Sequence, residues 1–231
     1  RGVRLWLHKQ MPLGSGLGSS AASSVGGAVA VNALFGDMLS KHDIVNCALH
    51  GEAAASGTAH ADNVAPSVFG GIVLIRTSDP LDVISLPVPT ALRVVVVHPH
   101  TEVLTAEARR LVAERHYTID QAVHNLGNVA ALVTALHQEN LALFARSISD
   151  ALVEPVRAPL VPGYATVKKA ALDAGALGCS ISGSGPSVVA FADSDTLAEH
   201  VATAIEDAFL SHSLTSDRYV GPVNGTGAQV V

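Results

Sequence analysis

The chain has 231 residues, of which 48% are hydrophobic, 15% charged and 4% aromatic, and its formal net charge is −6 at pH 7. This composition excludes intrinsic disorder, and an acidic chain without a basic run has no long-range attraction for nucleic acid or an anionic membrane. Cys47 and Cys179 lack metal-ligand spacing, so we expect reduced thiols and a cytoplasmic location. We find neither a run of about 18 apolar residues nor a signal peptide.

Residues 1–87 are expected to form a first domain. It begins with Val3–His8, whose alternation predicts a strand with one buried face, followed by a glycine-rich loop. The next predicted elements are helices at 21–35 and 43–56, a loop at 57–66 and a strand at 71–76. Pro80, Pro87 and Pro89 place the domain boundary near the end of this part.

Residues 88–231 are expected to form a second domain in which strands alternate with paired helices. The predicted strands are 93–98, a hairpin of 179–182 with 188–192, and a last strand at 229–231. The predicted helices are 101–114, 119–137, 140–152, 164–174 and 196–209. A proline-rich loop is expected at 154–163. The fold class is therefore α+β.

The strongest chemical signal is the run Pro12-Leu13-Gly14-Ser15-Gly16-Leu17-Gly18-Ser19-Ser20-Ala21-Ala22. Alternate glycines let the backbone approach a ligand closely, and the following helix offers its N–H groups and dipole to an anion. The spacing matches neither the Walker pattern nor the dinucleotide fingerprint. Phosphate binding is the favoured interpretation; a plain turn capped by Ser19 or Ser20 is the alternative.

Glu52 is expected on the same helix face as the small residues Val45 and Ala48. A carboxylate in apolar surroundings needs a partner. Magnesium, with a loop serine as a further ligand, is one such partner; a salt bridge or a solvated helix end would also explain the residue.

Two further groups of polar residues suggest a binding site. His60, Asp62 and Asn63 concentrate in one predicted loop, where capping and turn formation are the alternative. Thr105 and Arg109 share a helix face, and Arg157 lies in the proline-rich loop. Two arginines can bind a carboxylate through forked hydrogen bonds, although for either arginine alone a solvated surface position is the favoured interpretation.

Two short motifs remain. Ser182-Gly-Ser-Gly-Pro186 supplies a second glycine turn, which a hairpin alone would explain. His98 and His100 resemble a metal-binding pair, but no third ligand is suitably spaced, so histidines at a strand end are the simpler interpretation.

Taken in order, these motifs resemble the GHMP kinases, a superfamily that includes galactokinase, homoserine kinase and mevalonate kinase. Residues 12–22 look like the phosphate loop of that superfamily, and residues 179–190 look like its third motif. Gly57–Pro66 and Glu154-Pro-Val-Arg157-Ala-Pro resemble the homoserine kinase family specifically. The resemblance spans nearly the whole chain.

The resemblance implies a two-domain fold: an N-terminal domain like the second domain of ribosomal protein S5 and a ferredoxin-like C-terminal domain. Because only 11 residues precede Pro12, we expect the N-terminal domain to be partial. The implied activity is ATP-dependent phosphorylation of L-homoserine to O-phospho-L-homoserine, on the route to threonine. The implied assembly is a homodimer.

The resemblance also implies roles for residues. Residues 12–22 match the ATP cradle, and Ser19 and Glu52 match the magnesium ligands. The positions that match the homoserine pocket are His60, Asn63, Thr105, Arg109, Arg157 and Gly183. The expected catalytic set is Glu52, Ser19, Asn63 and Arg157.

The expected mechanism is direct in-line phosphoryl transfer. Asn63 matches the position where mevalonate kinase-like members have an aspartate base, so we assign no base. The alternatives are another GHMP kinase, acting on mevalonate or a sugar, and a sensor without catalytic activity on the same scaffold.

Overall fold

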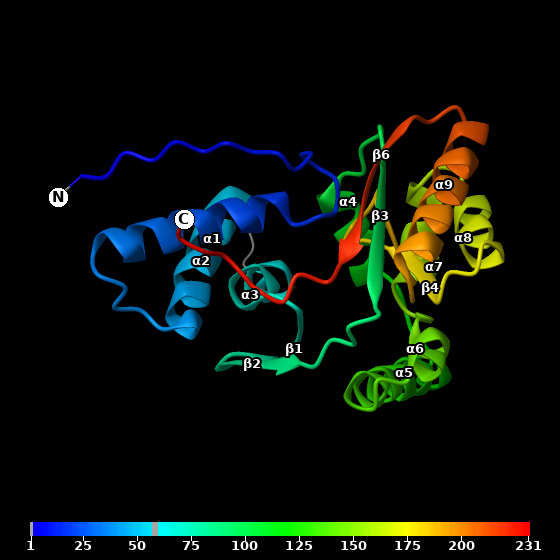
Figure 1. Ribbon diagram of the computed structural model, residues 1–231, viewed down its shortest axis with the longest axis horizontal. Coiled ribbons are helices and arrows are strands. Elements are labelled where there is room, and N and C mark those ends of the chain that lie inside the picture. Colours follow the sequence, from blue (N-terminus) through cyan, green and yellow to red (C-terminus); the bar gives the residue numbers. More distant parts are fainter. Residues whose placement is uncertain (1, 57–59) are drawn as a thin grey trace. The chain divides into compact units, whose positions relative to one another are not determined.

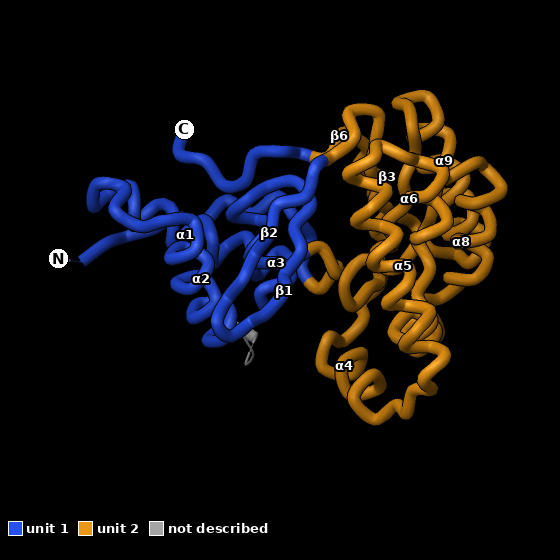
Figure 2. The backbone as a smooth tube through the Cα atoms, turned by 90° about the horizontal axis from the view of Figure 1, so that it is seen from below, with its two compact units in different colours: residues 1–13, 18–87, 224–231 blue, residues 14–17, 88–223 orange. Residues whose placement is uncertain are grey.

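The computed structural model describes residues 2–56 and 60–231, in two compact units (Figure 1). Unit 1 comprises residues 1–13, 18–87 and 224–231, and unit 2 comprises residues 14–17 and 88–223 (Figure 2). Both units contain helices and antiparallel strands, which confirms the α+β class. Among the described residues, no helix has both the length and the apolar character that crossing a membrane requires.

Unit 1 is built on three mutually packed helices, α1 (Ser19–Leu34), α2 (Lys41–Ser56) and α3 (Ala61–Phe69). Small and β-branched side chains let these helices approach closely; the buried set is Ala21, Val25, Ile44, Val45, Ala48, Val64, Ala65 and Val68. β1 (Ile72–Ser78) pairs antiparallel with β2 (Leu81–Leu86), and β1 also contacts α3.

Two predictions for unit 1 are wrong. Val3–His8 forms no strand, because a strand needs a partner for its backbone hydrogen bonds and no described strand pairs with this segment. The predicted loop 57–66 is helical from Ala61 onward, since burial of Val64 and Ala65 outweighs the turn preference of Asp and Asn. Residues 57–59 of that loop lie outside the described residues.

Unit 2 is built on a four-stranded antiparallel sheet with the order β4–β5–β3–β6. Its strands are β3 (Arg93–Pro99), β4 (Gly178–Ile181), β5 (Val188–Ala192) and β6 (Ser216–Pro222). α8 (Tyr164–Asp173) and α9 (Asp195–Ser211) pack on the sheet (Figure 1). The order of elements is β-α-β-β-α-β, the pattern of ferredoxin-like domains, and it confirms that expectation.

The segment between β3 and α8 carries further helices of unit 2. They are α4 (Thr105–Ala113), α5 (Ile119–His137), α6 (Leu141–Ser147) and α7 (Glu154–Arg157), the last followed by a 3-10 turn at Ala158–Leu160. The predicted loop 154–163 is therefore partly helical, because a proline is well tolerated in the first turn of a helix. The predicted helix 140–152 ends earlier, at Ser147.

The strand predicted at 229–231 is also wrong. The last strand of the chain is β6, which pairs with β3 along its whole length. β6 lies at the edge of the sheet and contains Asp217 and Arg218, and charged residues are typical of edge strands that must not aggregate.

Candidate functional site

The glycine-rich loop precedes α1 and uses the conformational freedom of its glycines. Gly14, Gly16 and Gly18 have φ angles of 62°, 77° and 74°, in the left-handed region that favours glycine. Gly18 itself is the N-cap of α1, so capping by Ser19 or Ser20 does not account for the loop. The backbone N–H groups of the first helical turn are therefore available at the end of the loop, as an anion site requires.

In unit 2 the loop packs on the second glycine turn, between β4 and β5. A Cβ atom at Gly16 would lie 2.2 Å from the carbonyl oxygen of Ser182. The Ser182 hydroxyl donates to the carbonyl oxygen of Gly16 at 3.0 Å, and the Ser187 N–H donates to that of Ser15 at 3.3 Å. Two motifs more than 160 residues apart in sequence thus form one backbone contact that only glycine permits.

In unit 1 the end of the loop meets α3. A Cβ atom at Gly18 would lie 3.1 Å from Oδ1 of Asn63. Asn63 lies in the first turn of α3, whose N-cap is His60. The structure therefore brings the expected phosphate loop and two expected homoserine-pocket residues to the same part of unit 1.

Glu52 lies beside the start of α1. Its side chain is buried in unit 1, and its Oε2 accepts a hydrogen bond of 2.7 Å from the hydroxyl of Ser20. The hydroxyl of Ser19, the serine expected as a magnesium ligand, lies 3.5 Å from the carbonyl oxygen of Met11. The hydroxyl that contacts Glu52 is therefore that of Ser20, whereas the hydroxyl of Ser19 bonds to Met11. Carboxylate and hydroxyl oxygens are ligands suited to a hard cation that keeps phosphate and water ligands.

In unit 2 two of the remaining expected residues, Thr105 and Arg157, contact the second glycine turn. Nη1 of Arg157 donates to the carbonyl oxygen of Gly183 at 2.6 Å. The hydroxyl of Thr105 lies 3.3 Å from that of Ser184. α4, which carries Thr105 and the half-buried Arg109, contacts α7, which carries Arg157. Thr105 and Arg157 therefore both contact this turn, and Arg109 lies on the helix that packs against α7.

The predicted site residues thus form two groups. The group in unit 1 is Gly18, Ser19, Ser20, Ala21, Ala22, Glu52, His60 and Asn63, with Pro12 and Leu13. The group in unit 2 is Gly14, Ser15, Gly16, Leu17, Thr105, Arg109, Arg157 and Gly183. The loop contributes to both, because the chain passes between the units at Leu13–Gly14 and at Leu17–Gly18.

His98 and His100 have hydrogen-bonding roles. Nδ1 of His98 lies 3.0 Å from the Ser187 hydroxyl, and His100 contacts Thr215 and Asp217. Burial lowers the pKa of His98, and the charge of the nearby His100 lowers it further. The described residues contain no group of three or more His, Cys, Asp or Glu side chains placed to hold a metal.

The sequence did not predict the hydrogen bonds by which serine hydroxyls join the motifs; these hydroxyls belong to Ser20, Ser182, Ser184 and Ser187. Each lies inside a motif that was identified, but motif spacing reveals glycines more readily than the partner of a hydroxyl. The pairing of Ser20 with Glu52 depends on the packing of α1 against α2, which the sequence of either helix does not specify.

The comparisons with known proteins agree with these motifs. The chain matches the GHMP kinases N terminal domain over residues 1–71 and the GHMP kinases C terminal domain over residues 132–211. It is 47% identical over 232 residues to the homoserine kinase of Chlorobaculum tepidum, covering 99% of this chain and 71% of the relative. It is 37% identical over 230 residues to that of Xylella fastidiosa, covering 100% and 70%.

Among solved structures, the homoserine kinase from Cytophaga hutchinsonii has a TM-score of 0.93 and 50% identity, covering 96% of this chain and 70% of that chain. The L. major mevalonate kinase in complex with R-mevalonate has a TM-score of 0.71 and 19% identity, covering 93% and 68%. The second comparison shows a shared fold only.

Proposed function

Because this chain belongs to the homoserine kinase family of the GHMP kinases, we propose that it transfers the γ-phosphoryl group of ATP to the side-chain hydroxyl of L-homoserine. The observation that carries this proposal lies in unit 2. The turn that packs on the phosphate loop at Gly16 also accepts the hydrogen bond of Arg157 at Gly183. A group suited to binding a carboxylate and a loop suited to binding phosphate therefore share one turn.

On the nucleotide side, the glycine loop and the start of α1 would bind the phosphates through backbone N–H groups and the helix dipole. Phosphoryl transfer depends mainly on positioning and charge stabilisation. Ser19 and Glu52 would hold a magnesium ion, with Ser20 orienting the carboxylate. When bound, the ion neutralises charge on the phosphate oxygens.

On the acceptor side, homoserine carries a carboxylate that needs a cationic partner. Arg109 and Arg157 offer planar guanidinium forks, which a lysine does not reproduce. His60, Asn63, Thr105 and Gly183 would line the rest of the pocket. Asn63 is not a base, so its role is to orient the acceptor hydroxyl, and no catalytic base is assigned.

The direct test is mass detection of O-phospho-L-homoserine after the full-length protein is incubated with ATP, magnesium and homoserine. Mevalonate and galactose in parallel reactions distinguish another GHMP kinase. ATP binding without any phosphorylated product would instead indicate a sensor. Within an active protein, Arg157→Leu should raise the KM for homoserine strongly and that for ATP less, because it removes the charged partner of a bound carboxylate.

We also propose a homodimer, as the family resemblance implies. A supporting observation is an apolar stripe on α5 formed by Ile119, Val123, Leu126 and Val129, which are between 50% and 77% exposed. Their spacing places them on one helix face. Light scattering should give twice the mass of the chain, and Leu126→Lys should shift the protein toward monomer. A monomeric wild type would contradict the proposal.

For the location we propose the cytoplasm. Cys47 and Cys179 are both free, as a reducing compartment would keep them.

A further inference from the structure

If Arg157 binds the homoserine carboxylate, as proposed above, its guanidinium must be held in a fixed position. Arg157 is the last residue of α7, a helix of only four residues. A single helical turn is not stable alone, because fixing its backbone costs more free energy than its one hydrogen bond returns. The direction of the Arg157 side chain must therefore be set by the neighbours of α7.

The start of α7 is held by Asp150. The carboxylate accepts hydrogen bonds from the backbone N–H groups of Leu152, Val153 and Glu154, at distances between 2.7 and 3.2 Å. Asn125 of α5 donates to the same carboxylate at 2.7 Å and accepts from the Ala151 N–H at 2.8 Å. Burial alone would raise the pKa of Asp150, but these hydrogen bonds lower it overall.

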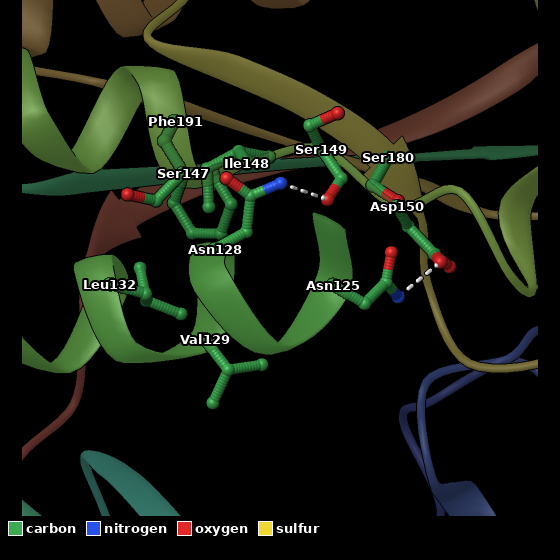
Figure 3. Close-up of a pocket in the computed structure, with 10 residues that line it drawn as sticks. All are labelled: Asn125, Asn128, Val129, Leu132, Ser147, Ile148, Ser149, Asp150, Ser180 and Phe191. Atoms are coloured by element: carbon green, nitrogen blue, oxygen red, sulfur yellow. Dashed lines mark hydrogen bonds between the residues drawn. The ribbon is translucent and has the colours of Figure 1, made fainter. Parts of the chain in front are cut away.

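These bonds matter because packing does not fill the space beside the loop. A cavity of about 260 Å³ in unit 2 is lined by residues of α5, the end of α6, the loop 148–150 and the sheet, Asp150 and Ser180 among them. Figure 3 shows Asn125 reaching Asp150 and Asn128 reaching Ser149 from α5. The loop is thus fixed on this side by directed hydrogen bonds.

Glu154, the first residue of α7, ties the helix to two other elements. One carboxylate oxygen pairs with Lys168 of α8. The other accepts a hydrogen bond of 3.0 Å from the Ser180 hydroxyl of β4. The side chains of Glu154 and Lys168 are only 12% and 27% exposed. Burial, followed by the charge of Glu154, raises the pKa of Tyr164, so the carboxylate acts inside a buried cluster.

Two parallel connections therefore join α7 to β4 and the turn that follows it. Glu154 bonds to Ser180, and Arg157, three residues later, bonds to Gly183, also three residues later. We propose that Glu154 is a positioning residue for Arg157: it anchors the start of α7 to β4 and α8, so that the guanidinium at the end of the helix keeps its place at the second glycine turn.

A purely stabilising role is a weaker explanation of this pair. A buried ion pair often adds little net stability, because desolvation offsets the attraction between the charges. Removing one partner of the Glu154–Lys168 pair, however, leaves the other charge without compensation, so the remaining side chain moves. Because Glu154 begins the helix that ends at Arg157, we expect this movement to displace Arg157.

The test compares variants of the full-length protein. Glu154→Gln and Lys168→Gln should each raise the KM for homoserine about tenfold, while kcat and the KM for ATP stay within about twofold, because the altered contact is with the acceptor. Lys169→Gln is the matched control, since Lys169 is also ion-paired on α8, but with the exposed Asp173. It should leave all three constants unchanged.

The decisive measurement is a double-mutant cycle. On an Arg157→Leu background, Glu154→Gln should change the homoserine KM less than twofold, because residues acting through one contact are not additive. Full additivity would overturn the proposal. So would an unchanged KM in Glu154→Gln when Arg157→Leu alone raises it; in that case the proposed function stands.

If Arg157→Leu itself leaves the homoserine KM unchanged, both the proposed role of Arg157 and the positioning role fail. If Glu154→Gln does not fold, as judged by circular dichroism, Ser180→Ala removes only the bond to Oε2. It should then raise the homoserine KM in the same direction with a smaller factor, and no rise would overturn the proposal.

Discussion

At the scale of single residues, Glu52 is the position on which the proposed magnesium site depends most. It is a buried carboxylate on α2, spaced seven and four residues after the buried Val45 and Ala48, and it accepts a hydrogen bond from the Ser20 hydroxyl. The sequence indicated that this carboxylate needs a polar partner. Which serine faces it follows only from the packing of α1 on α2.

Glu52→Gln should lower turnover by about a hundredfold or more, because a bound metal contributes several kcal/mol of charge stabilisation. The fold should survive, since the amide can still accept from Ser20. Steady-state kinetics at saturating magnesium measure this, with Asp43→Asn as the control, an exposed carboxylate on α2 that bonds to Ser40. Wild-type turnover in Glu52→Gln would remove this residue from the metal site.

His98 allows a prediction of pH dependence. Its pKa is lowered in the folded protein, so the unfolded chain binds the proton more readily. The contribution of His98 to the free energy of unfolding is therefore fully present above the unfolded pKa of about 6.5, and it is lost as the pH drops below that value. The slope from this one group is at most about 1.4 kcal/mol per pH unit.

Urea unfolding between pH 8 and pH 5 measures this effect. His98→Gln should show a shallower loss of stability than the wild type, whereas His200→Gln, at an exposed position on α9, should keep the wild-type slope. Equal slopes for the wild type and His98→Gln would show that His98 does not contribute.

At the scale of elements, predictions succeeded where pattern and capping agreed. The apolar period predicted a helix at Ile119–His137, and α5 has those bounds. Its start is fixed by a capping box between Thr118 and Gln121. The four consecutive valines of β3 likewise predicted a buried strand, and Val95 and Val97 are fully buried. In both cases local sequence and tertiary packing favour the same structure.

Predictions failed where a distant part of the chain decides the outcome. Val3–His8 alternates like a strand, but alternation describes side chains and does not supply a partner. α3 forms around Pro66 because its apolar face packs on α1 and α2. The short α7 depends on Lys168 and Ser180, neither of which a local pattern connects to it.

The phosphate loop gives a matched pair of variants. Gly14→Ala and Gly16→Ala each force a side chain into a left-handed conformation, which costs about 1–2 kcal/mol. A Cβ atom at Gly14 would meet nothing within 4 Å, whereas one at Gly16 would collide with the backbone of Ser182 and Gly185. Gly16→Ala should therefore raise the KM for ATP and lower the free energy of unfolding clearly more than Gly14→Ala. Equal effects would mean that the contact between the loop and the turn is not essential.

At the scale of the whole molecule, the two units are not continuous in sequence. The last eight residues of the chain belong to unit 1, although β6 just before them belongs to unit 2. In unit 1, the Gly71 N–H donates to Asn224 at 2.7 Å, and the Ala228 N–H donates to Ser67 at 2.8 Å. Sequence motifs pointed to most of the candidate site. The return of residues 224–231 to unit 1 could not be predicted in this way, because its hydrogen bonds join backbone groups, which no side-chain pattern reveals.

Gly227→Ala should loosen this C-terminal segment, because a Cβ atom there would lie 2.0 Å from the carbonyl oxygen of Val68. Loss of the two backbone bonds should weaken unit 1 by about 1–3 kcal/mol. Amide hydrogen exchange should accelerate at Gly71 and Ala228 and stay unchanged in β3. Gly225→Ala, where a Cβ atom meets nothing within 4 Å, is the control, and equal exchange in both variants would contradict the prediction.

The turn between β4 and β5 has a consequence for redesign of the acceptor preference. Ser182 donates to the phosphate loop at Gly16, and the adjacent Gly183 accepts from Arg157. Any substitution that moves this turn to admit a longer hydroxy amino acid must also disturb the glycine loop that is expected to bind ATP. α4 reaches the turn through the hydroxyl pair of Thr105 and Ser184. A library that varies the exposed side chains of α4 should therefore change acceptor choice at little cost in ATP affinity, whereas a library built on the turn should lose both substrates together.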